Sequence, residues 1–420
     1  LLFGPVLAGL LGILLPAFGY LPVLGRSELS LQPFRDLLAM PGLGRSVGLS
    51  LGTGLATTAI AFAIVILFIA GWRGTRAFNA LERLVSPLLS VPHAAAAFGL
   101  ALLIAPSGFL VRLLSPWGTG WDRPPDLLIV QDSWGLAMTF GLIAKEIPFL
   151  LLIALAALPQ ARAAEMQRLI AALGYGRILG FVHAVLPALY RQIRLAVFAV
   201  LAYSTSVVDL AMVLGPTTPA PLAVRILDWQ NDPDLDRHFV AAAGAVLQIG
   251  VTGLALLLWL AAERICRAVA RRVAASGKRG RADVWLRHAV AALIFACAGA
   301  ILAGIVLLSL WSVAGRWRFP QALPHSLTLA TWARLLPSLA GPVRDTFALG
   351  VAASLAALVL TLGALEYETR SGRHRSGRAL KSLFVPLLVP QVAFLFGLQG
   401  LFSAVAFDGT FPAVLLALLV

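Results

Sequence analysis

Five polar side chains interrupt long apolar stretches of the sequence: His93, Lys145, Glu146, Asp209 and Gln391. Placing an ionised side chain at the centre of a bilayer costs about 2.5–3.5 kcal/mol, so a charge in such a stretch needs either a partner or a function. The function that these residue types serve most directly is contact with a polar solute that crosses the membrane. We therefore take the five residues as candidates for a solute path.

Each of these candidates also has a structural explanation. Asp209 follows hydroxyl residues at 204–206 and would suit a cationic solute such as a thiazolium or a polyamine, but a hydrogen bond within a helix bundle explains it nearly as well. Lys145 and Glu146 could contact the solute or a gate, or could pair with neighbouring helices. His93 and Gln391 each follow a proline, where they could line a seam between two halves of the protein or simply pack.

The sequence does not have the spacing of metal-dependent or nucleotide-binding sites. It contains neither H-E-x-x-H nor G-x-x-x-x-G-K-[ST], and Gly277-Lys278 lacks both the first glycine and the following hydroxyl residue of the latter motif. Cys266 and Cys297 are too few for a disulfide framework. We expect no enzymatic activity, no cofactor and no metal, since the six histidines also lack metal-ligand spacing; they lie at positions 93, 183, 238, 288, 325 and 374.

Composition identifies the solvent of this chain as lipid. Of its 420 residues 60% are hydrophobic and 12% charged, and its mean hydropathy is +0.89. A soluble domain carries about 25% charged residues. Because the apolar runs are continuous and show no two-residue alternation, they predict helices rather than a barrel. We predict an all-α polytopic membrane protein with about ten spanning segments, near 1–24, 47–71, 84–111, 134–158, 195–215, 239–262, 289–313, 346–365, 382–405 and 410–420.

The distribution of charge predicts the orientation of these segments. The net charge is +14, and the basic residues concentrate in the loops after the second, fourth, sixth and eighth segments. The alternate loops, 112–133 and 216–238, carry most of the aspartates. Arginine-rich loops remain in the cytoplasm, so we expect a cytoplasmic N-terminus, and the net charge needs no nucleic-acid partner to explain it.

The two halves of the chain resemble each other. Residues 51–103 realign with residues 349–401 at an offset of 298, which matches Pro92 with Pro390 and the triplet 98–100 with 396–398. Shared prolines and glycines in the same loop context favour a duplication over chance similarity. We predict a first half at 1–262, a basic cytoplasmic linker at 263–287 and an incomplete second half at 288–420.

The loop at 159–194 has the pattern of a surface hairpin. Met166, Leu169, Ile170 and Leu173 follow one another at helical spacing and form one apolar stripe. The glycines at 174 and 176 permit a turn, and a second short helix can follow through 178–182 before the chain returns to the membrane. A hairpin with one apolar face is suited to docking into a groove of a soluble partner.

This loop resembles the cytoplasmic signature of the permeases of binding-protein-dependent ABC importers. That signature has Glu-Ala-Ala, then a glycine four residues after the second alanine, then Leu-Pro twelve and thirteen residues beyond the glycine. The opening triplet is replaced by residues 168–170, and Glu165 lies one helical turn earlier, where it could supply the acidic contact. The residues that fit the family pattern are Leu173, Gly174, Phe181, Leu186 and Pro187.

The resemblance extends to double-length permeases, which fuse two halves as in thiamine-type and ferric-iron-type importers. It implies a bacterial inner-membrane protein that forms the solute path and binds two separate ATP-binding cassette subunits at its cytoplasmic face. It also implies a periplasmic solute-binding protein, which would largely set the specificity. A second signature loop would follow the tenth segment, so we expect the given chain to be truncated at both ends.

Two other functions are compatible with parts of this pattern. An ion-coupled secondary transporter would explain the repeat and the buried charges, but it would not need the hairpin at 159–194. A membrane-embedded enzyme would need a catalytic constellation that the histidine spacing does not supply. The transported solute stays open at this point.

Overall fold

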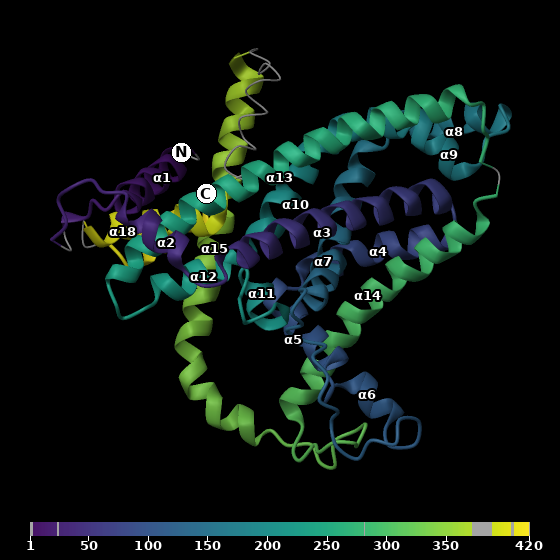
Figure 1. Cartoon of the computed structure of the whole chain (residues 1–420). Helices are drawn as coiled ribbons and strands as arrows, with labels where there is room; N and C mark the ends of the chain where they lie inside the picture. Colours follow the sequence, from purple (N-terminus) through teal and green to yellow (C-terminus); the bar gives the residue numbers. More distant parts are fainter. Residues whose placement is uncertain (1–2, 23–24, 281, 372–388, 405–406, 420) are drawn as a thin grey trace. The chain divides into compact units, whose positions relative to one another are not determined.

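Helices are the regular elements of the computed structural model, which describes residues 3–22, 25–280, 282–371, 389–404 and 407–419 (Figure 1). Within these ranges six helices are long and apolar enough to cross a membrane, and the bent pair α9 and α10 would add a seventh. The prediction of an all-α polytopic membrane protein is confirmed, while the number of spans stays a prediction. The six are α3 (Leu43–Trp72), α5 with α6 (His93–Ile104 and Phe109–Leu114), α7 (Leu136–Ala157), α13 (Asp236–Ala275), α14 (Val284–Val313) and α15 (Ala330–Ser371).

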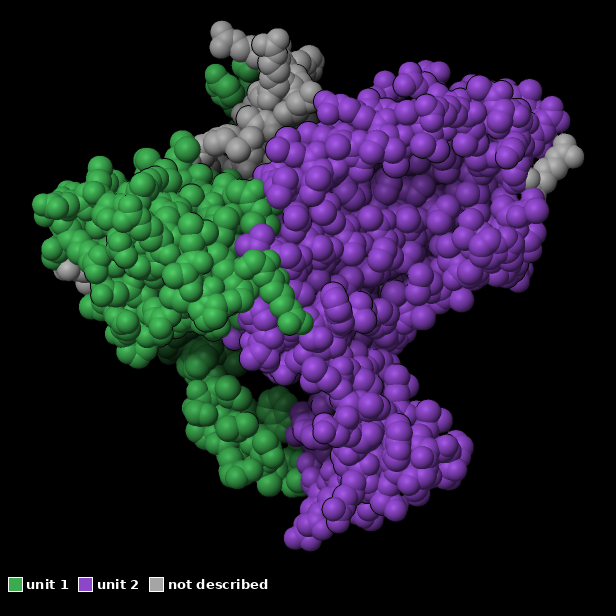
Figure 2. Space-filling view, viewed as in Figure 1, with its two compact units in different colours: residues 1–45, 222–252, 328–420 green, residues 46–221, 253–327 purple. Residues whose placement is uncertain are grey.

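The chain forms two compact units, each made of segments that are distant in sequence (Figure 2). The larger unit contains residues 46–221 and 253–327. Its core includes the fully buried side chains of Phe68, Phe181 and Leu189. Its shorter helices are α4 (Arg76–Ser90), α8 (Ala163–Ala172), α9 (Arg177–Ala184), α10 (Leu186–Ser206) and α11 (Asp209–Leu214).

The smaller unit contains residues 1–45, 222–252 and 328–420. Gly9 and Gly12 let α1 approach the backbone of α18 so closely that a Cβ at either position would overlap it. No residue of α15 is buried, although the helix contacts α19. The unit's other helices are α1 (Phe3–Ala17), α2 (Gln32–Ala39), α12 (Leu222–Gln230), α18 (Gln391–Ala404) and α19 (Phe411–Leu418).

Helix positions agree with the predicted repeat. Helix α5 begins at His93 and α18 begins at Gln391, a separation of 391 − 93 = 298 residues. The matched glycines also make the same kind of close helix contact. Gly99 touches the backbone of Gly304 in α14, and Gly397 touches the backbone of Gly9 in α1. Since α14 packs on α5 and α1 packs on α18, the compact units do not coincide with the predicted halves. The division into 1–262 and 288–420 stays a prediction about the repeat.

Three predicted segments differ from the observed helices. The segment 84–111 is broken at Pro92, which has no N–H to continue α4. The segment 195–215 begins earlier, with α10, and is broken at Val207 and Val208. Most of the linker 263–287 is helical, because its arginines and alanines are good helix formers that extend α13 to Ala275. Residues 372–388 of the eighth loop and the ninth segment lie outside the described residues.

Candidate functional site

Four polar side chains from four helices lie next to one another inside the larger unit. His93 Nε2 of α5 lies 3.7 Å from Glu146 Oε1 of α7. The ring of His93 is 5.0 Å from the ring of Tyr203 of α10, measured between centroids. The Tyr203 hydroxyl in turn donates to Asp209 Oδ1 of α11 at 3.3 Å. We call His93, Glu146, Tyr203 and Asp209 the polar cluster.

The polar cluster runs from the interior of the unit to its surface. Glu146 is only 5% exposed, the side chain of His93 is about one third exposed, and Asp209 is exposed. Two carboxylates at the ends with a histidine and a tyrosine between them form a site that favours a cation over an anion. Sequence reasoning missed Tyr203, since nothing in its spacing reveals that α10 brings it against His93.

Lys145 adjoins this cluster in the sequence but has a different environment. Its ammonium group donates to the carbonyl oxygens of Leu88 at 3.1 Å and Val91 at 2.6 Å. The Leu88 carbonyl would accept from residue 92 in a continuous helix, but Pro92 has no N–H to give. Lys145 therefore caps the end of α4, where a cation is also favoured by the helix dipole. This contact corresponds to the structural alternative for Lys145, in which the side chain pairs with a neighbouring helix.

Asp209 lies at the first residue of a short helix rather than within a continuous span. Its Oδ1 accepts from the backbone N–H of Leu210 at 2.8 Å as well as from Tyr203. The preceding hydroxyls at 204–206 are buried, and those of Thr205 and Ser206 donate to the carbonyl of Ala202 in their own helix. The break after α10 thus separates Asp209 from these hydroxyls and leaves its carboxylate accessible.

Gln391, the fifth candidate, begins α18 in the smaller unit, where its side chain is exposed. The other four sequence candidates and Tyr203 all belong to the larger unit.

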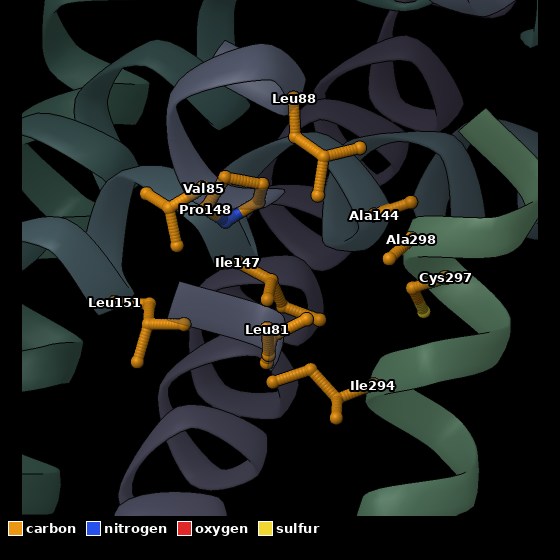
Figure 3. Close-up of a pocket in the computed structure, with 10 residues that line it drawn as sticks. All are labelled: Leu81, Val85, Leu88, Ala144, Ile147, Pro148, Leu151, Ile294, Cys297 and Ala298. Atoms are coloured by element: carbon orange, nitrogen blue, oxygen red, sulfur yellow. The ribbon is translucent and has the colours of Figure 1, made fainter. Parts of the chain in front are cut away.

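A small void beside Pro148 is part of the apolar core (Figure 3). Its volume is about 10 Å³, which is room for no more than a water molecule. Side chains of α4, α7 and α14 surround it, and none of those shown is ionisable apart from the thiol of Cys297. The proline in α7 therefore leaves a packing defect and not a solute-sized cavity.

The predicted hairpin is present as α8, a glycine turn and α9. Gly174 has φ +77°, a left-handed conformation that residues with a Cβ resist. Gly180 of α9 lies so close to Ile170 of α8 that a Cβ there would overlap the isoleucine side chain. After α9 the chain turns by 70° into α10, with Pro187 in the first turn of the new helix.

The residues of the hairpin divide into a buried and an exposed set. Phe181 is fully buried and Leu186 packs on the same core, so these two hold the hairpin in place. Leu169 is 53% exposed and Leu173 64%, and Glu165 is exposed on the turn before them. Positions 165, 169 and 173 succeed one another every four residues, so they share one face of α8. We call Glu165, Leu169 and Leu173 the open face.

Three hydrogen bonds fix α9 to the rest of the unit. The N–H of Gly176 donates to the carbonyl of Arg279 at 2.7 Å, and the N–H of Ile178 donates to Asp283 Oδ2 at 3.0 Å. Arg177 Nη1 donates to the carbonyl of Gly71 at the end of α3, at 3.1 Å. The first two bonds satisfy backbone N–H groups at the start of α9, and the Arg177 side chain ties the hairpin to α3.

The comparisons with known proteins point to one class. No family model matches the chain. Over 387 residues, which are 92% of this chain and 67% of the relative, it is 27% identical to the inner membrane ABC transporter permease protein YnjC of Escherichia coli (strain K12). The similarity supports an ABC transporter permease. It also supports a multi-pass protein of the inner membrane, in agreement with the apolar helices.

Proposed function

We propose that the chain is the permease subunit of an ABC importer and that the α8–α9 hairpin couples it to ATP-hydrolysing subunits. The observation that carries this proposal is the open face. Two leucines that expose more than half of their surface lie on a hairpin whose other side is anchored in the core. An exposed apolar face on a rigid support marks a site for a protein partner.

Helix α10 supplies the mechanical link in this proposal. It begins at Leu186, directly after the hairpin, and ends at Ser206, three residues beyond Tyr203. A helix of 21 residues is about 31 Å long and moves as one body. A displacement of the hairpin by the ATP-hydrolysing subunits would therefore be transmitted to Tyr203 in the polar cluster.

The charges of the polar cluster favour a small cationic solute. Glu146 and Asp209 carry two negative charges against the single positive charge of the neighbouring Lys145, whose ammonium group donates to two neutral backbone carbonyls. A thiamine-like cation fits this pattern, and a periplasmic binding protein would deliver it. The N-terminus is proposed to lie in the cytoplasm, which places the hairpin on the same side as ATP.

Uptake into proteoliposomes tests the proposed function. The assembled transporter is reconstituted with its binding protein, and ATP is enclosed in the vesicles. Radiolabelled thiamine is the first solute added outside. Any solute found bound to the purified binding protein is tested next. We expect accumulation with ATP and none with a non-hydrolysable analogue, irrespective of ion gradients.

Buried carboxylates beside a histidine would also suit an ion-coupled carrier. Accumulation driven by a proton or sodium gradient without nucleotide would establish that alternative and contradict our proposal.

A further inference from the structure

A basic groove lies between α9 and the last turns of α13. Figure 1 shows these two elements next to each other. Its volume is about 500 Å³, and its walls come from α9, the start of α10 and α13, all within the larger unit. The side chains that define it are Val182, His183, Pro187, Arg264, Arg267 and Arg271.

The arginines of the groove are mostly unneutralised. Among the described residues, Arg264 and Arg271 have no hydrogen-bond acceptor or carboxylate partner. Arg267 Nη2 lies 3.7 Å from Glu263 Oε2, but that carboxylate is already engaged by Arg194 at 2.8 Å. Three guanidinium groups beside one shared carboxylate leave a net positive groove, which favours a phosphate or carboxylate ligand.

His183 adds a polar atom that has no partner. Its Nδ1 lies 2.8 Å from the carbonyl oxygen of Leu179, so Nδ1 carries the proton and donates it. The other ring nitrogen, Nε2, is buried and unpaired among the described residues. The His183 ring lines the groove, so this unpaired nitrogen belongs to the groove wall.

The position of the groove near the end of a membrane helix favours the phosphate of a lipid headgroup over a free phosphate ion as the ligand. The apolar part of α13 extends to Ala262, and Arg264 follows two residues later. Once α13 spans a bilayer, Arg264 would therefore follow directly on the hydrocarbon part, where the headgroups lie. Val182 and Pro187 provide an apolar wall beside the arginines, as a glycerol and acyl chain would require. Basic pockets at the end of membrane helices bind anionic headgroups, and each basic residue near such a surface contributes about 1 kcal/mol.

We propose that the basic groove binds the phosphate of an anionic phospholipid, with the acyl chains lying along α13. The lipid would then brace the hairpin against α13 from the membrane side. This proposal is independent of the proposed function, since it requires only that α13 spans the membrane.

Native mass spectrometry of the full chain in detergent tests the lipid site. The chain is titrated with phosphatidylglycerol or phosphatidylcholine, and the first bound lipid is quantified. We expect phosphatidylglycerol to bind more tightly than phosphatidylcholine. In the variant R264Q/R267Q/R271Q this preference should fall about a hundredfold, from three lost charges. The control R83Q/R272Q/K278Q removes equal charge from exposed positions outside the groove and should change the affinity less than threefold.

The remaining outcomes overturn the proposal. Equal affinity for both lipids, or an equal loss in the control variant, would mean that the groove does not recognise a phosphate. Displacement of the lipid by excess inorganic phosphate would make the ligand a free anion. Full lipid binding combined with loss of the ATP-hydrolysing subunit would make the groove a protein interface. The single variants R264Q and R271Q break no hydrogen bond or ion pair among the described residues, so they report on binding if the triple variant is unstable.

Discussion

The ammonium group of Lys145 holds the end of a helix that Pro92 interrupts. Its two bonds to the carbonyls of Leu88 and Val91 replace the backbone donors that α4 lacks. These two hydrogen bonds matter more in a membrane than in water, because no water is available there to donate to an unpaired carbonyl. One charged residue thereby supplies donors to two carbonyls at the junction of α4 and α5.

Removal of this cap should destabilise the protein. Lys145→Met leaves one buried and one partly buried carbonyl without donors. A buried unsatisfied carbonyl costs about 1–3 kcal/mol, so we expect the free energy of unfolding to fall by about 2 kcal/mol. Thermal unfolding of the purified chain in detergent, followed by size-exclusion chromatography, measures the change. Arg83→Met, at an exposed position of α4, is the control and should leave the midpoint unchanged. An unaltered midpoint for Lys145→Met would show that the two bonds contribute nothing.

The carboxylate of Asp209, unlike the ammonium group of Lys145, is accessible, and among the described residues its hydrogen-bond partners are Tyr203 and the N–H of Leu210. Asp209→Asn keeps the shape and removes the charge, so we expect about tenfold weaker uptake of a cationic solute and intact assembly with the ATP-hydrolysing subunits. Asp126→Asn, at an exposed position outside the cluster, should transport normally. Wild-type uptake by Asp209→Asn would remove this residue from the solute path.

At the scale of elements, the spacing of residues along the sequence predicted the features of the hairpin that depend on neighbouring residues. The stripe at Met166, Leu169, Ile170 and Leu173 and the glycine at 174 predicted both the helices and the turn of the hairpin. The stripe did not predict that Ile170 packs against Gly180 while Leu169 and Leu173 remain open. That division depends on where α9 lies, which spacing within α8 cannot determine.

The polar cluster could likewise be predicted only in part, because some of its contacts depend on the tertiary structure. Hydropathy singled out His93, Glu146 and Asp209, because charges in apolar stretches are costly and therefore conspicuous. It gave no sign of Tyr203, which is amphipathic and unremarkable in a membrane helix. Nor could it separate Lys145 from Glu146, since their different partners come from the break at Pro92, 53 positions before Lys145.

At the scale of the molecule, the compact units differ from the halves that the predicted repeat would define. Gly99 and Gly397 occupy matched positions and each receives a helix from a distant part of the chain, α14 or α1. A repeat that exchanges its first helices would produce such discontinuous units. The sequence contained the matched glycines, but their packing partners could not be assigned without the structure.

The most direct test of the account is a photo-crosslink from the open face. A benzoylphenylalanine replaces Leu173 in cells that contain the whole transporter, and its crosslinked products are identified by mass spectrometry. We expect a product with the ATP-binding cassette subunit. The matched position is Trp117, which is 78% exposed in the loop predicted for the opposite side of the membrane, and it should give no such product. Absence of the product from position 173, or its appearance from position 117, would contradict the proposal that this hairpin couples transport to ATP.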